Sequence, residues 1–239
     1  MQHLTMYMEN IFYGKNGIET GALQAGVVYN NTIKNIYINI ANMFTDTGLV
    51  IKDGIKLSNL SYTELPFKID TSTMTNMDGM FLSCTNLTTI PLIDTSNVTN
   101  MGGMFRYCIN LATIPLIDTS NVTNMERMFL SCPNLTTIPL LDTSNVTNMN
   151  SMFHHCNKLS SMPLIDTSNV TNMERMFDSC PSLNNTSLNN ILAMCINVTR
   201  IPSNKKTLRH IGLTQAQAQV CTTLSNYQAF VNAGWTTGY

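Results

Sequence analysis

The chain has 239 residues, of which 44% are hydrophobic and only 11% are charged. This hydrophobic content is enough to form a core, which excludes a disordered chain. The 13 basic and 14 acidic residues give a formal net charge of −1. Such a balance argues against a nucleic-acid partner, because phosphate neutralisation needs a dense basic patch. The polar residues are mostly uncharged and include 30 Asn and 31 Thr.

The N-terminal segment shows no sign of a targeting sequence. Met1–Asn10 contain no basic start and no apolar stretch of signal-peptide length. No run of about 18 apolar residues predicts a helix that inserts into a membrane. We therefore expect neither a secretion signal nor a membrane anchor in this chain.

A pattern of residues recurs every 24 positions from residue 70 to residue 180. The tripeptide Asp-Thr-Ser begins at Asp70, Asp94, Asp118, Asp142 and Asp166. Met-Phe pairs begin at Met80, Met104, Met128, Met152 and Met176, and Cys84, Cys108, Cys132, Cys156 and Cys180 follow them. A constant period of this length indicates a solenoid in which each coil buries its apolar side chains against the next coil.

The segment from Leu87 to Cys108 predicts one coil. Residues 87–93 alternate like a short strand, and the apolar residues of 98–108 recur at helical spacing. The inward side chains are expected to be Leu87, Ile90, Leu92, Val98, Met101, Met104, Phe105 and Cys108. The prediction is an α/β fold: a right-handed solenoid with parallel strands on one face, short helices on the other, and terminal caps.

Three regions follow from where the period holds. Residues 1–66 are expected to form an N-terminal cap with degenerate repeats, and residues 67–183 to form about five repeats. Residues 184–239 are expected to form a C-terminal helical cap, with helices at 187–195, from 214 and from 225, and a strand at 207–213.

The repeat unit N-L-x-x-I-P-L-x-D-T-S-N-V-T-N-M-x-x-M-F-x-x-C, as it stands at 86–108, closely resembles the BspA-like leucine-rich repeats of bacterial and mycoplasma surface proteins. The resemblance covers about half of the chain. It implies a leucine-rich-repeat fold and a non-catalytic protein that binds host proteins, matrix or other cells. It also implies an extracellular or virion-associated location.

The repeated polar and sulfur-containing residues have structural explanations. The stacked aspartates are expected to accept hydrogen bonds from the Thr-Ser turn rather than to hold a row of cations. The cysteines are expected to be buried thiols without disulfides or metal, and His154-His155-Cys156 is not expected to converge on an ion. Sequons begin at Asn97, Asn121, Asn145 and Asn169, where an internal asparagine ladder is favoured over glycosylation.

Two surfaces are candidate binding sites. The exposed face of the strands is uniform and uncharged, and its candidates are Thr89, Thr113, Thr137, Ser161, Ile93, Ile117, Leu141 and Ile165. The helix side differs from coil to coil, and its candidates are Arg106, Tyr107, Arg127 and Arg175.

The sequence therefore predicts a non-catalytic module that binds a protein or glycan at a bacterial or host cell surface. No catalytic or nucleotide-binding motif occurs, and neither a cofactor nor a metal is expected. The first alternative is a structural spacer or phage tail or appendage component with no ligand. The second is a glycan hydrolase, which is disfavoured because the carboxylates belong to the repeat turns. The oligomeric state is left open.

Overall fold

The structure is a computed structural model that describes residues 69–239, Leu57 and the backbone of five short strands before them. These strands are β1 (Leu23–Gln24), β2 (Val28–Tyr29), β3 (Thr32–Ile33), β4 (Tyr37–Ile38) and β5 (Leu49–Val50). β1 pairs with β4 and β2 with β3 in antiparallel fashion, and β5 pairs in parallel with β6 (Ile69–Asp70). The rest of the expected cap at 1–66 lies outside the described residues.

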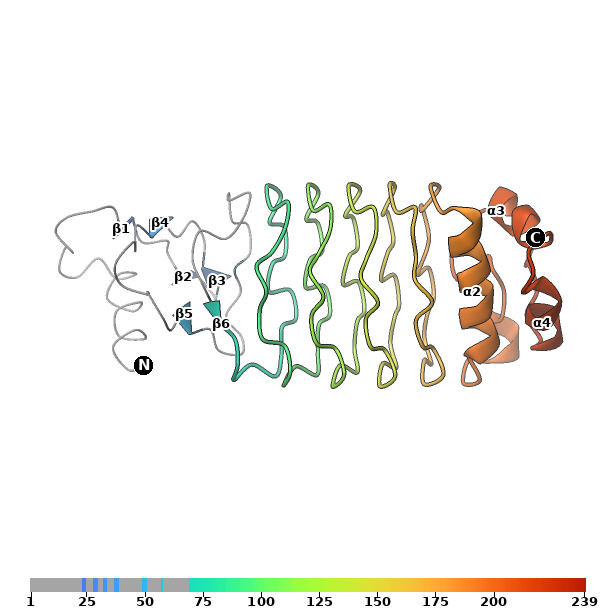
Figure 1. The fold of residues 1–239 in the computed structure, drawn as a ribbon, viewed down its shortest axis with the longest axis horizontal. Coiled ribbons are helices and arrows are strands. Elements are labelled where there is room, and N and C mark those ends of the chain that lie inside the picture. The colour runs from blue at the N-terminus through green and yellow to red at the C-terminus, as the bar shows by residue number, and fades with distance from the viewer. Residues whose placement is uncertain are drawn as a thin grey trace.

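From residue 71 to residue 183 the chain winds into coils that stack along the long axis of the molecule (Figure 1). Isolated parallel bridges join equivalent asparagines of successive coils at Asn76, Asn100, Asn124, Asn148 and Asn172. The solenoid with a 24-residue period is therefore confirmed in this segment.

The segment expected to be helical in each coil is a series of tight turns. In one coil, the backbone N–H groups of Met101, Gly103, Phe105 and Tyr107 donate to carbonyls 23 residues later, in the next coil. The N–H groups between them bond within the coil, as in Met104 N–H to the Met101 carbonyl, 3.2 Å. The expectation of short helices is wrong, because every second peptide group bonds across coils instead of along a helix.

Two positions in each coil also exclude a right-handed helix, because their φ angles are positive. The first left-handed position holds Gly79, Gly103, Arg127, Ser151 and Arg175, with φ between 53° and 59°. The second holds Ser83, Tyr107, Ser131, His155 and Ser179, with φ between 57° and 64°. Left-handed residues rarely occur within helices, and only glycine adopts this conformation without strain.

The segment expected to be a strand, residues 87–93, has no regular strand geometry. Its coil-to-coil backbone bonds are sparse, as in Ala112 N–H to the Thr88 carbonyl, 3.2 Å. Pro91 has no N–H to donate, and its equivalents recur in the following coils, so a continuous ladder cannot form here. The expected parallel strands on this side are therefore reduced to isolated contacts such as the bridge between Thr137 and Ser161.

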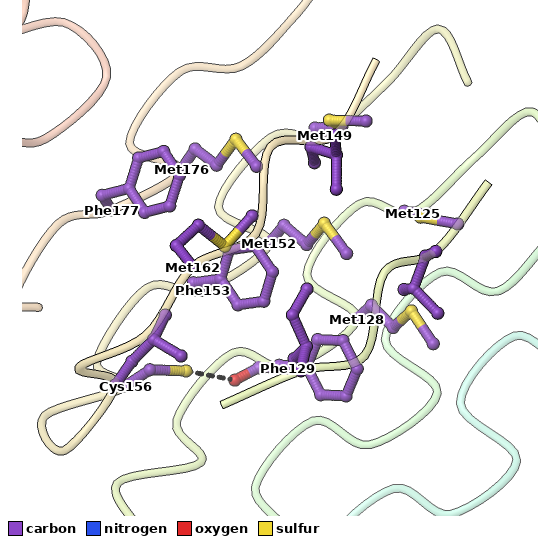
Figure 2. Packing of buried hydrophobic residues seen from close by; sticks show 14 of the residues in the cluster. Met125, Met128, Phe129, Met149, Met152, Phe153, Cys156, Met162, Met176 and Phe177 are labelled. Atoms are coloured by element: carbon purple, nitrogen blue, oxygen red, sulfur yellow. Dashed lines mark hydrogen bonds between the residues drawn. The ribbon is translucent and has the colours of Figure 1, made fainter. Parts of the chain in front are cut away.

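The core is a file of equivalent apolar side chains. Phe81, Phe105, Phe129, Phe153 and Phe177 stack with ring centroids 5.5 to 5.8 Å apart and nearly parallel planes. Figure 2 shows the methionines beside this stack, with Met128, Met152 and Met176 following one another from coil to coil. Each Met-Phe pair therefore occupies the same environment in every coil, as the repeat predicts.

Three helices lie at the C-terminal end: α2 (Asn185–Asn197), α3 (Gln215–Cys221) and α4 (Tyr227–Asn232), with a 3-10 turn at Ser203–Lys205 (Figure 1). The Asn184 side chain caps α2, and Thr214 and Gln217 form a reciprocal capping box at α3. The expected helices are present. The strand expected at 207–213 is reduced to a bridge between Thr207 and Thr236.

The segment before α3 closes the stack. The carbonyls of His210 and Ile211 accept from the N–H groups of Arg175 and Phe177, as a further coil would. A Cβ atom on Gly212 would lie 2.4 Å from the Asp178 backbone nitrogen, so only glycine allows this close approach. In the described part of the chain, no helix is both long and apolar enough to cross a membrane.

Candidate binding surface

Four leucines on consecutive coils point into solvent, and we call them the leucine row. Their exposed fractions are 76% for Leu92, 63% for Leu116, 63% for Leu140 and 49% for Leu164. The expectation that Leu92 faces inward is wrong. It rested on the alternation of a regular strand, which does not predict the leucine row. The available signal was the proline before each leucine, since proline disturbs the alternation of a strand.

The row of Ile93, Ile117, Leu141 and Ile165, expected to be exposed, is buried at 2 to 5% exposure. The reason is a shift of the alternation at Pro91, which is half-buried, so that Leu92 faces outward and Ile93 inward. These four residues cannot contact a ligand from the surface. Of the other strand-face candidates, Thr113 and Ser161 are exposed and Thr89 and Thr137 are half-buried.

Two residues after each leucine of the row stands an exposed aspartate, and we call Asp94, Asp118, Asp142 and Asp166 the acid row. In Asp94, Oδ1 accepts from the Ser96 backbone N–H at 3.0 Å and from the Ser96 hydroxyl at 2.7 Å. The hydroxyl and the backbone N–H hold the pKa of Asp94 below its ordinary value. The expected bonding of the aspartates by their own turns is confirmed.

Cross-coil hydrogen bonds hold the turn that carries each aspartate. The buried Thr95 hydroxyl donates to the Asp118 carbonyl of the next coil at 2.7 Å, and Asn97 Nδ2 donates to the Ser72 carbonyl at 2.9 Å. Equivalent bonds recur along the stack. The asparagines of the sequons therefore form the expected ladder to turn backbone, although Asn97 itself is exposed rather than internal.

The candidates on the turn side of the coils bond to their own neighbours. Arg106 lies over the Tyr107 ring, 4.6 Å from its centroid, and its Nη2 donates to the Tyr107 hydroxyl at 2.8 Å. Arg127 forms an ion pair with Glu126 at 3.1 Å. These side chains are separate from the leucine row, and their chemistry changes from coil to coil.

The third arginine of this side, Arg175, joins a small ionic cluster. It donates to Asp178 Oδ2 at 2.8 and 2.9 Å, and His154 Nε2 lies 3.5 Å from the same oxygen. Burial and the adjacent His155 hold the pKa of His154 below its ordinary value. Burial raises the pKa of Asp178, but the Arg175 bonds and His154 outweigh this effect and leave it lowered.

His154 and His155 lie closer together than helical geometry allows. Their rings stack with centroids 4.2 Å apart, because this segment is a turn and His155 has φ of 61°. Adjacent side chains of a helix point about 100° apart, and this geometry does not apply to the turn. Within the described residues, however, no three His, Cys, Asp or Glu side chains are grouped to hold a metal ion.

The cysteines are free and buried. The Cys156 thiol donates to the Phe129 carbonyl of the preceding coil with S···O of 3.2 Å (Figure 2). The thiols of Cys108, Cys132 and Cys180 donate to the equivalent phenylalanine carbonyls of their own preceding coils. Burial raises the pKa of Cys132 to about 12. Protonated thiols of this kind bond to the core backbone, and they supply no nucleophile at neutral pH.

None of the curated proteins matches this chain. Among solved structures, the crystal structure of a leucine-rich-repeat protein from T. pallidum matches at 14% identity, with a TM-score of 0.38. The match covers 71% of this chain and 90% of that protein.

A family model described as "Mycoplasma protein of unknown function, DUF285" matches residues 38–137 and 109–208. The two overlapping matches span residues 38–208, which is more than half of the 239 residues. The chain therefore belongs to the DUF285 family of repeat proteins.

Proposed function

We propose that this chain is a non-catalytic interaction module that binds a protein or glycan at a bacterial or host cell surface, and that it does so through the leucine row. Extracellular action is part of the proposal and rests on the resemblance of the repeat to BspA-like surface proteins. The right-handed winding is also proposed, since it is the usual hand of parallel crossover connections. Membership of a repeat family with a solenoid fold is consistent with an interaction role.

The observation that carries the proposal is an exposed apolar position that holds the same residue in four coils whose turn sides differ. The coils have diverged on the turn side, where the position of Arg106 holds Leu130, His154 and Asp178 in later coils. The leucine position is exposed, so core packing does not require an apolar side chain there, yet it holds leucine every time. Contiguous exposed apolar side chains are typical of an interaction site.

The test is binding to an array of glycans and cell-surface proteins with matched variants. We expect the wild-type chain to bind at least one component, and the double variant Leu116→Ser/Leu140→Ser to lose that component. Ile109→Ser is the control, because it removes a comparable side chain, 43% exposed, outside the row.

Three results would contradict the proposal. A ligand retained by the double variant places the site elsewhere. Loss of the ligand in Tyr107→Ala or Arg127→Ala places it on the turn side. Absence of any ligand favours the alternative of a structural spacer or phage appendage component.

A further inference from the structure

This inference rests on the proposed function and names the partner. The leucine row and the acid row form one surface, because Leu92 and Asp94 are both exposed while Ile93 between them is buried. We call this surface the leucine-acid face. It offers a partner a line of apolar contacts with a parallel line of negative charges beside it.

The negative charges of the acid row have no cation within the described residues. In each aspartate of the row, Oδ1 accepts a hydrogen bond from the backbone N–H of the serine two residues later. Oδ2 accepts no hydrogen bond from residues 69–239, and none of the ion pairs in this segment involves the row. The basic residues of the four coils have other partners: Arg106 lies over Tyr107, Arg127 pairs with Glu126 and Arg175 with Asp178, and Lys158 Nζ donates to Asn134 Oδ1. A ligand for the face must therefore supply positive charge.

The spacing of the coils limits the shape of that ligand. Equivalent residues repeat at about 4.8 Å along a hydrogen-bonded ladder, and ring centroids of the phenylalanine stack repeat at 5.5 to 5.8 Å. The turn of an α-helix advances about 5.4 Å, within this range. Side chains on one face of an extended strand repeat at about 6.6 Å and lose register by about 2 to 5 Å across the three steps between four coils.

We propose that the leucine-acid face binds a basic amphipathic α-helix of a protein partner, lying along the axis of the stack. Leucine-like side chains of the helix, one per turn, pack against the leucine row. Lysine or arginine side chains at the edge of its apolar stripe pair with Oδ2 of the acid row. Four coils require a helix of about 15 residues.

The probe is a synthetic amphipathic peptide of about 18 residues, with leucines on one face and lysines on the other. Its binding to the whole chain is measured by fluorescence anisotropy. Peptides of the same composition in scrambled order, or with glutamate in place of lysine, are the ligand controls. We expect binding of the amphipathic basic peptide alone, weakened at least several-fold between about 0.05 and 0.3 M salt.

Two pairs of variants test the face. Leu116→Ser/Leu140→Ser is expected to lower the affinity for the peptide about tenfold or more. Asp118→Asn/Asp142→Asn keeps an oxygen that accepts the serine bonds. It is expected to lower the affinity for the peptide several-fold and to reduce the salt dependence of binding. Asp178→Asn, which removes a negative charge outside the face, is the matched control and is expected to leave the affinity unchanged. Circular dichroism of each variant checks that the fold is kept.

Each other outcome overturns the inference. Equal binding by the face variants and by wild type shows non-specific attraction. Self-association that Leu116→Ser/Leu140→Ser abolishes shows that a second copy covers the row. If the array ligand depends on the row but the peptide does not bind, the helix is the wrong partner while the proposed function stands. If the array also gives no ligand, both fail.

Discussion

The left-handed positions predict opposite effects for two substitutions in neighbouring coils. Gly103 and Arg127 occupy the same position with φ of 56° in both, and Gly103 N–H and Arg127 N–H make the same cross-coil bond. Both residues therefore adopt the same left-handed conformation, but its free-energy cost differs between glycine and arginine. Arg127→Gly should stabilise the protein, and Gly103→Ala should destabilise it.

The magnitudes follow from three contributions. A left-handed conformation costs a residue with a Cβ atom about 1 to 2 kcal/mol. Glycine itself lowers the free energy of unfolding by about 0.5 to 1 kcal/mol, because it has more conformational freedom in the unfolded chain. At Gly103 a Cβ atom would be 3.8 Å or more from its neighbours, so no clash adds to the cost. The exposed Arg127–Glu126 pair contributes little. Each substitution should change the free energy of unfolding by about 0.5 to 1 kcal/mol.

The assay is urea unfolding followed by circular dichroism, with the change taken from the shift of the midpoint. Arg127→Ala is the matched control, because it removes the same side chain and ion pair but keeps the strained backbone. It should leave the free energy of unfolding near that of wild type. The reasoning is refuted if Arg127→Gly is no more stable than Arg127→Ala, or if Gly103→Ala is as stable as wild type.

Three further predictions follow from the core, the turns and the cap. Phe129→Ala opens a cavity between two stacked rings and should lower the free energy of unfolding by about 3 to 5 kcal/mol; an unchanged urea midpoint contradicts the packing. Because the pKa of Asp94 is lowered in the folded state, its contribution to stability is present at neutral pH and is lost as the pH falls through that lowered pKa. Ser96→Ala should raise this pKa toward its ordinary value in an NMR titration, and no change would refute the role of the turn. The thiol of Cys132, with its pKa raised to about 12, should react with a thiol reagent only on unfolding, so rapid labelling of the native chain contradicts its burial.

Much of the architecture could be predicted because the repeat makes every inward residue meet its own equivalent. The period, the phenylalanine file, the buried cysteines and the start of α3 near Thr214 follow from spacing and from local preferences. The turn geometry could not be predicted in this way. Spacing of three and four residues is shared by a helix and by successive tight turns, and arginine or histidine at a left-handed position carries no local signal.

The binding surface was harder to predict than the core, because one residue decides which row faces solvent. Strict alternation from Ile90 places Leu92 inside and Ile93 outside, and the structure has the reverse. Pro91 lacks an N–H and breaks the pleat, so the outward direction covers two successive residues. The acid row was correctly assigned to its turns, since Asp followed by Ser two residues later specifies the bond locally.

The cross-coil bonds of the turn side are also aligned, and their peptide dipoles point in one direction. Their N–H groups all point toward the C-terminal end, as in the column from Phe81 through Phe105 and Phe129 to the Ile211 carbonyl. Peptide dipoles aligned in this way add together, as they do along an α-helix, with the positive pole at the end toward which the N–H groups point. Fewer bonds run the other way, such as Thr99 N–H to the Thr75 carbonyl and Ala112 N–H to the Thr88 carbonyl. The turn side of the stack is therefore polarised from one end to the other, although the formal net charge of the chain is −1.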